Sequence, residues 1–145
     1  GIGFPLALAF DRSGRLYVLN GLFGGGTDVT VYAAASLTLA YTIEAGVINA
    51  SAIALDSHDN LYVANDGDKR APESVTEYAR GTVTPLRTIS TGIRHPIALA
   101  LDARGNLYVA NSPSGTSTVT VYAPHMNSPV RTYVLSESAT ALAIR

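Results

Sequence analysis

Hydrophobic and polar residues alternate in short runs along this chain, and one pattern occurs three times, in residues 5–20, 50–65 and 96–111. Each copy has an apolar run rich in alanine, an aspartate, a polar turn, a Leu-Tyr-Val segment and an asparagine. The copies follow one another at intervals of 45 and 46 residues. Self-similarity at such a period predicts an array of similar supersecondary units that stack on their neighbours.

Each unit predicts four short β-strands. The first is the apolar run, whose alternation of alanine with larger residues predicts an inner strand buried on both faces. The turn after it begins with aspartate, which favours a tight hairpin. The second strand is the Leu-Tyr-Val segment, and two more strands with β-branched and aromatic residues follow. The expected strands are 6–10, 16–19, 29–32 and 39–43, then 52–55, 61–64, 75–78 and 86–89, then 97–101, 107–110, 119–122 and 130–134.

No stripe of apolar residues at the helical period is present, so the chain is predicted to be all-β. The asparagine at the end of the second strand recurs as Asn20, Asn65 and Asn111. Because a binding site usually breaks repeat symmetry, this asparagine and the recurring turn aspartate are interpreted as structural. Gly24–Gly26 is expected to be a flexible loop. It is not interpreted as a phosphate-binding loop, because no Lys-Ser or Lys-Thr follows it and no helix is predicted there.

The third copy reads Pro-x-x-Leu-Ala-x-Asp-x-x-Gly-Asn-Leu-Tyr-Val-Ala-Asn. This sequence motif resembles the NHL-type β-propeller repeat, and the resemblance covers nearly the whole chain. It implies blades of four antiparallel strands, at approximately 5–45, 50–90 and 96–135. Residues 140–145 would be an extra inner strand. Residues 1–145 would then be one propeller segment, a partial or half propeller.

Three blades would leave two apolar blade faces open to water. Two arrangements remedy this. In the favoured one, the remaining blades of a longer chain complete the ring. In the other, a second copy of this chain joins head to tail, and exchange of residues 140–144 closes each seam.

Composition and charge limit the classes of partner and site that the chain is expected to have. The net charge is −1, and Lys69 is the single lysine, so nucleic acid is disfavoured. There is no cysteine, which excludes disulfides and thiolate metal sites. No apolar run approaches the length of about 20 residues that a membrane span needs. The repeat regularity and the low charge, with very little lysine, favour an extracellular or periplasmic setting.

His95 is the sharpest candidate for chemistry, because it precedes an inner strand where the strands would converge. The resemblance implies that His95 is a candidate metal ligand, since some NHL-like lyases hold a metal through histidines on such loops. The equivalent residues here are Phe4 and Asn49, so the repeats supply one imidazole where zinc needs three or four ligands. We therefore predict no metal, no cofactor and no catalytic residue. His58 and His125 are interpreted as surface residues.

The most charged segment is residues 65–73, interpreted as a solvated loop with local ion pairs. By strand parity it should emerge at the same end as His95, together with loops 21–28 and 112–118. A ligand face, if present, would form there. The candidate ligand-binding residues are His95, Arg94, Asp66, Asp68, Lys69 and Arg70.

The sequence lacks a recognisable Ser-His-Asp grouping and a repeated carboxylate pair. The favoured function is therefore a non-catalytic propeller scaffold or binding module for protein or carbohydrate, as part of a larger propeller. The alternative is a metal-assisted NHL-like lyase or a gluconolactonase-like hydrolase, with part of its site outside this chain.

Overall fold

The computed structural model describes residues 3–22 and 25–136, which form twelve antiparallel β-strands and no helix. Unit 1, unit 2 and unit 3 each contain four consecutive strands. Unit 1 has β1 (Phe4–Phe10), β2 (Leu16–Leu22), β3 (Gly25–Tyr32) and β4 (Leu39–Ile43). Unit 2 has β5 (Ala50–Leu55), β6 (Leu61–Asn65), β7 (Ser74–Tyr78) and β8 (Arg87–Ile89). Unit 3 has β9 (Pro96–Leu101), β10 (Leu107–Asn111), β11 (Thr118–Tyr122) and β12 (Arg131–Val134).

All twelve strands expected from the sequence are confirmed, with small differences at their ends. The prediction of a flexible loop at Gly24–Gly26 is wrong for its last two residues, which open β3. Gly26 pairs with Ala50 of β5, and a Cβ added at Gly26 would lie 2.9 Å from the Ala50 carbonyl oxygen. Glycine therefore permits the close approach of two strands. The expected strand at residues 140–145 lies outside the described residues.

Each unit is an antiparallel meander in which every strand pairs with its neighbour in sequence. The sequence predicts three separate sheets, whereas the Gly26–Ala50 pair links units 1 and 2. The described strands thus form one eight-stranded and one four-stranded sheet. Neither sheet closes on itself.

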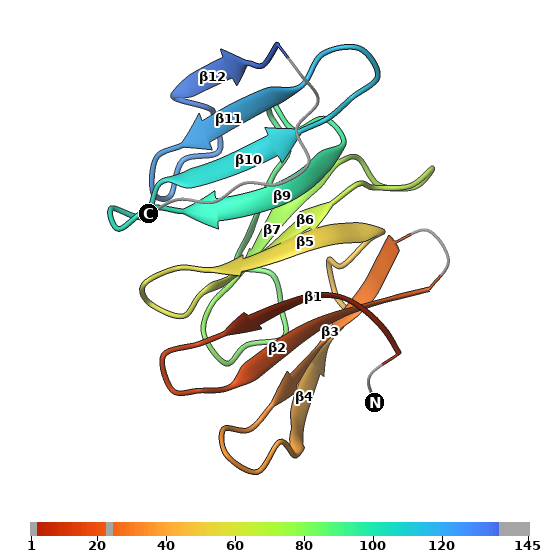
Figure 1. Ribbon diagram of the computed structural model, residues 1–145, viewed down its shortest axis with the longest axis vertical. Coiled ribbons are helices and arrows are strands. Elements are labelled where there is room, and N and C mark those ends of the chain that lie inside the picture. The colour runs from red at the N-terminus through yellow and green to blue at the C-terminus, as the bar shows by residue number, and fades with distance from the viewer. Residues whose placement is uncertain (1–2, 23–24, 137–145) are drawn as a thin grey trace.

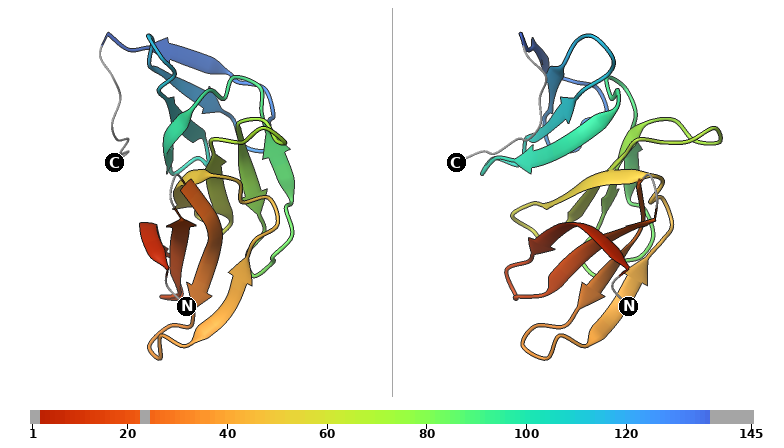
Figure 2. Two further views of the ribbon diagram at one scale, coloured as in Figure 1. Left: turned by 90° about the vertical axis from the view of Figure 1, so that its right-hand side faces the viewer. Right: turned by 45° about the vertical axis from the view of Figure 1, so that its right-hand side comes forward.

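The units stack along the long axis of the molecule, with unit 1 at one end and unit 3 at the other (Figure 1). β5 lies beside both β1 and β9, so the first strands make the main contacts between units. The turned views show the outermost strands β4 and β12 at opposite ends of the stack (Figure 2). The backbone contacts between units are therefore concentrated at the first strands.

Two hydrophobic cores fill the spaces between units. In the first, Tyr17 and Ile43 of unit 1 pack with Ile53 and Leu61 of unit 2. In the second, Tyr62 and Ile89 of unit 2 belong to the cluster that includes Leu99 and Leu107 of unit 3. Each core is built from the back of one unit and the front of the next, as expected for stacked repeats. Burial of this apolar surface is the main stabilising contribution between units.

The recurring polar residues make the structural bonds that the sequence predicts. Asn65 Oδ1 accepts from Ile48 N at 2.9 Å, and its Nδ2 donates to Thr76 Oγ1 at 3.0 Å. Asn111 makes the equivalent bonds to Arg94 N and Thr120 Oγ1. These bonds connect the segment before each unit to its second and third strands.

The turn aspartates close the hairpins between the first and second strands. Asp56 Oδ1 accepts from His58 N at 2.7 Å and from Asn60 N at 2.9 Å. Asp102 Oδ1 accepts equivalent bonds from Arg104 N and Asn106 N. A carboxylate that bonds its own turn replaces backbone partners that a hairpin leaves unsatisfied.

A tyrosine at the end of the third strand bonds the segment that leads into its own unit. The Tyr78 hydroxyl donates to Ala45 O at 2.6 Å, and the Tyr122 hydroxyl donates to Thr91 O at 2.6 Å. Both side chains are fully buried, and burial raises the pKa of Tyr78 to about 12. The equivalent Tyr32 of unit 1 is half-buried.

The expectation that every first strand is buried on both faces is wrong for β1. Leu8 is 62% exposed, whereas Ile53 and Leu99 at the same repeat position are 9% and 8% exposed. The alternation of residues is the same in the three strands. A preceding unit covers β5 and β9, and β1 has no such cover in the described residues.

Candidate functional site

The first candidate region lies where β6 ends and β9 begins, and is called the loop end. His95 precedes β9, and its Nδ1 lies 2.7 Å from Asp66 Oδ1. Its backbone N–H donates to Glu73 Oε1 at 3.0 Å, and its carbonyl accepts from Ser112 N at 3.0 Å. His95 is therefore held by residues of both unit 2 and unit 3.

The backbone conformation of His95 is shared with the equivalent residue of unit 2, whereas its side chain is not. His95 has φ of +47°, and the equivalent Asn49 has φ of +51°. Histidine and asparagine enter this left-handed region more readily than most residues. The positive φ is thus a structural feature of the junction, whereas the imidazole and its carboxylate partners occur in one copy.

A pocket of about 510 Å³ opens beside His95. Its lining is mainly polar, and the side chain of His95 is 52% exposed. The lining residues are Glu73, His95, Ser112, Pro113, Ser114 and Gly115. Loop 112–118 therefore reaches the loop end as predicted, whereas the described residues of loop 21–28 are not among those that line this pocket.

Glu73 is a functional candidate that was not predicted, because in the sequence it stands at the edge of a charged loop. A difference in loop length between the repeats could have revealed it. The segment between the second and third strands is much longer in unit 2 than the two-residue gap between β2 and β3. This extra length carries Glu73 back toward the next unit.

The other predicted site residues do not join His95. Asp68 folds its own loop, since its Oδ1 accepts from Arg70 N at 2.7 Å and from Ala71 N at 2.9 Å. Lys69 and Arg70 are exposed, and no ion pair within the described residues involves them. The local ion pairs expected for this loop are thus not formed.

Arg94 contributes its backbone to the loop end. Its N–H donates to Asn111 Oδ1 at 3.0 Å, and the residue is exposed. Any ligand contact by its guanidinium remains a prediction.

Within the described residues, the loop end does not supply a complete set of metal ligands. Across residues 3–22 and 25–136, no three His, Asp or Glu side chains are grouped so that they could hold one. Zinc in proteins generally takes three or four such ligands. The His95–Asp66 pair can instead position hydrogen-bond donors and acceptors toward the pocket.

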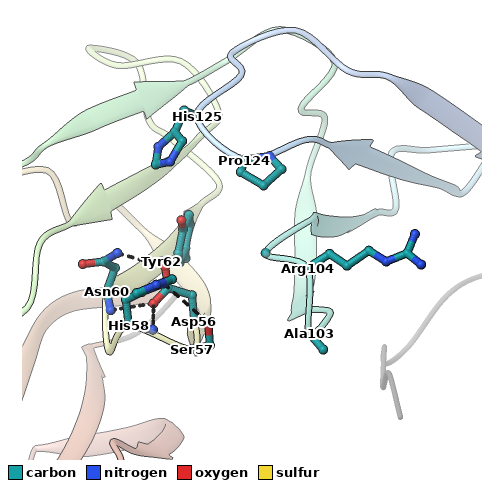
Figure 3. A pocket seen from close by; sticks show the side chains of 10 residues that line it. Asp56, Ser57, His58, Asn60, Tyr62, Ala103, Arg104, Pro124 and His125 are labelled. Carbon is teal, nitrogen blue, oxygen red and sulfur yellow. Dashed lines mark hydrogen bonds between the residues drawn. The ribbon is translucent and has the colours of Figure 1, made fainter.

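The second candidate region is a cleft of about 400 Å³ at the opposite end of the units, called the turn-end cleft. Figure 3 shows His58, Asn60 and Tyr62 of unit 2 on one side of this cleft, and Ala103 and Arg104 of unit 3 on the other. Pro124 and His125 complete the lining from the segment after β11. His58 and His125 are both exposed, as predicted.

A break in the repeat explains why this cleft is open. Between units 1 and 2, Asp59 Oδ1 accepts from Arg12 N at 3.0 Å and bridges the two turns. Unit 3 has Gly105 at the position of Asp59. Glycine offers no carboxylate for the turn of unit 2, so this bridge is missing between units 2 and 3. The change from Gly14 to Asp59 to Gly105 is the sequence signal that could have revealed the cleft.

Comparison of the chain with known protein families and with curated proteins finds no match. The described part of the chain contains no helix of the length and hydropathy needed to cross a membrane. Function must therefore be argued from the two candidate regions.

Proposed function

We propose that the three units are blades of a β-propeller and that the chain acts as a non-catalytic binding module. Antiparallel four-stranded units that stack face to face through their first strands support the blade interpretation. The repeated Asn and Asp residues make hydrogen bonds within each unit, which gives them a structural role. The candidates for ligand binding are therefore the residues that differ between the three units.

The observation that carries this proposal is the grouping of His95, Asp66 and Glu73 beside the loop-end pocket. These three side chains have no counterparts in unit 1, where the equivalent junction residue is Phe4. Binding residues commonly lie on loops that a rigid scaffold positions. The binding module would thus use the loops at one end of the stacked sheets.

The chemistry of the lining favours carbohydrate as the ligand class. The pocket presents an imidazole, a carboxylate and two serine hydroxyls. Such groups both donate and accept hydrogen bonds, which matches the hydroxyl groups of a sugar. A protein ligand is the other class to be tested.

A glycan array probed with the labelled chain tests the proposal. We expect binding to one or more oligosaccharides, and loss of that binding in His95→Ala. His58→Ala is the matched control, because it removes an exposed histidine at the opposite end. Equal binding by both variants would exclude the loop-end pocket. Absence of glycan binding would direct the search to protein ligands.

The His95–Asp66 contact is the observation that favours the alternative function, because carboxylates often orient metal-binding histidines. In that alternative, residues outside this chain would complete a metal-assisted lyase or hydrolase. Metal analysis of the purified protein and of His95→Ala separates the two functions. Stoichiometric zinc or calcium that is lost in the variant would favour the enzyme.

A further inference from the structure

The outer face of unit 1, here called the Leu8 face, consists of Leu8 and Phe10 on β1 and Leu16 on β2. Leu8 and Phe10 are 62% and 65% exposed, and Leu16 is half-buried. At the position of Leu16, Leu61 and Leu107 are each 2% exposed because another unit covers them. The Leu8 face is thus the same surface that units 2 and 3 use to contact a preceding unit.

The opposite end of the stack carries the complementary surface. This Tyr133 face consists of Tyr108 on β10, Val119 on β11 and Tyr133 on β12. Tyr133 is 44% exposed, whereas Ile43 and Ile89 at the same repeat position are 1% and 0% exposed. The Tyr133 face therefore repeats the surface through which units 1 and 2 contact a following unit.

The Tyr133 face carries one recess. This recess of about 380 Å³ has both aromatic or aliphatic and polar walls, and its lining residues are Arg104, Asn106, Tyr108, Val121, Val130, Arg131 and Tyr133. Phe10 lies at the same turn-proximal position of the opposing face, where units 2 and 3 have the smaller Leu55 and Leu101. A larger projection on one face thus corresponds to an open recess on the other.

A polar anchor is also repeated. Arg87 joins unit 2 to unit 3, since its Nη1 donates to Met126 O at 2.9 Å and to Asn127 Oδ1 at 3.2 Å. Arg131 occupies the equivalent position in unit 3, as the strand pairing shows. Its guanidinium carbon lies 5.6 Å from the centre of the exposed Tyr133 ring. The Tyr133 face therefore carries the arginine that elsewhere ties one unit to the next.

We infer that a second copy of this chain docks head to tail, with the Leu8 face of one copy against the Tyr133 face of the other. Phe10 enters the recess beside Tyr108, and Arg131 donates to the outer loop of the partner's unit 1. The contact continues the two interfaces already present inside the chain. This inference goes beyond the proposed function, because it depends on the sheet faces and not on what the loops bind.

The sizes of the surfaces favour two copies. Aromatic side chains bury about 150–250 Å² each, so each face contributes several hundred Å². A stable interface buries about 800 Å² per partner. Two head-to-tail copies can form both contacts at once if the units fan evenly, and each copy then buries both of its faces.

Native mass spectrometry and light scattering of the 145-residue chain provide the first test. We expect a native mass twice the chain mass of 15.1 kDa. A monomer at high micromolar concentration would overturn the inference and point to further units in a longer chain as the occupant. A concentration-dependent filament would overturn closure by two copies.

Matched variants provide the second test. Phe10→Lys and Tyr133→Lys should each give a monomer, because either one disrupts both contacts of a symmetric pair. Val83→Lys is the control, since Val83 is a similarly exposed apolar residue between β7 and β8 of unit 2, which contributes to neither face, and it should leave the mass unchanged. Circular dichroism checks that each variant is folded.

Mixing the variants tests the head-to-tail geometry. Phe10→Lys retains an intact Tyr133 face, and Tyr133→Lys retains an intact Leu8 face. A mixture of the two should therefore recover pairs through one intact contact, although neither variant pairs alone. If Tyr133→Lys alone still forms a dimer, the contact joins two Leu8 faces and the inference is wrong. None of these readouts depends on ligand binding, so they are independent of the glycan test.

Discussion

Units 2 and 3 contain almost the same strand sequence and differ in their surroundings. Tyr62 and Tyr108 occupy the same position in Leu-Tyr-Val-Ala-Asn. Tyr62 is 5% exposed, because unit 3 packs against it, whereas Tyr108 is half-buried. A residue in a stacked array is therefore buried by its neighbouring unit as much as by its own sheet.

Replacing these two tyrosines gives the largest expected difference. Tyr62→Ala should lower the free energy of unfolding by about 3 kcal/mol, as for a buried aromatic residue that leaves a cavity. Tyr108→Ala should lower it by about 1 kcal/mol in dilute solution, since less apolar surface is lost. Urea denaturation measures both values. Equal losses at low protein concentration would show that the neighbouring unit does not determine the cost.

Substitution of two glycines with positive φ distinguishes the cost of steric crowding from the cost of backbone strain. Gly46 has φ of +81°, and an added Cβ would lie 2.9 Å from the Tyr78 hydroxyl and 3.0 Å from Pro85 Cγ. Gly81 has φ of +75°, and nothing lies within 4 Å of its added Cβ.

We expect Gly46→Ala to cost about 2–3 kcal/mol, because strain and overpacking act together between units. Gly81→Ala should cost about 1 kcal/mol from strain alone. Thermal unfolding of both variants gives the comparison. A smaller loss of stability for Gly46→Ala than for Gly81→Ala would mean that the residues around Gly46 can move apart at little energetic cost.

The third-strand tyrosines extend the comparison to unit 1. Tyr78→Phe removes the bond to Ala45 O and should cost about 1 kcal/mol at neutral pH. Tyr32→Phe at the equivalent, half-buried position should change stability less.

The same pair predicts a difference at alkaline pH. Burial raises the pKa of Tyr78 from 10.0 to about 12, so the folded state keeps the proton that the unfolded state releases. Stability from this group is therefore full below pH 10 and is lost as the pH rises toward 12. Denaturant melts across this range should show a shallower fall for Tyr78→Phe than for Tyr32→Phe. Parallel curves would show that Tyr78 is not a determinant of alkaline unfolding.

The smallest expected effect is at the exposed turn of unit 3. The side-chain bond from Asn106, with the backbone bonds from Asn106 and Arg104, lowers the pKa of Asp102 below its ordinary value of 3.8. Because the folded-state pKa is depressed, this stability is present above pH 3.8 and is lost as the pH falls through the folded-state value. Asp102→Asn should flatten the acid side of the stability profile by less than about 1 kcal/mol. An unchanged acid profile would show that the turn carboxylate is not coupled to folding.

Much of the loop end could be predicted from the sequence. Strand parity placed His95 near the 65–73 and 112–118 loops, because direction alternates in a meander. The Asp66 contact and the role of Glu73 were not predictable, since they depend on how far one unit reaches toward the next. The turn-end cleft does not follow from the residues that the three turns share, because it results from the change from Asp59 to Gly105.

The sequence by itself determined the strands, their hairpins and the equivalence of the three units. Those features follow from residue period and turn chemistry, which act over a few neighbouring residues. The tertiary structure alone decided that the Gly26–Ala50 pair links two units and that His95 meets Asp66. Each of these features depends on which surface a unit meets in the folded chain. Repeats of nearly identical sequence can meet different surfaces, so the repeat sequence alone does not specify these contacts.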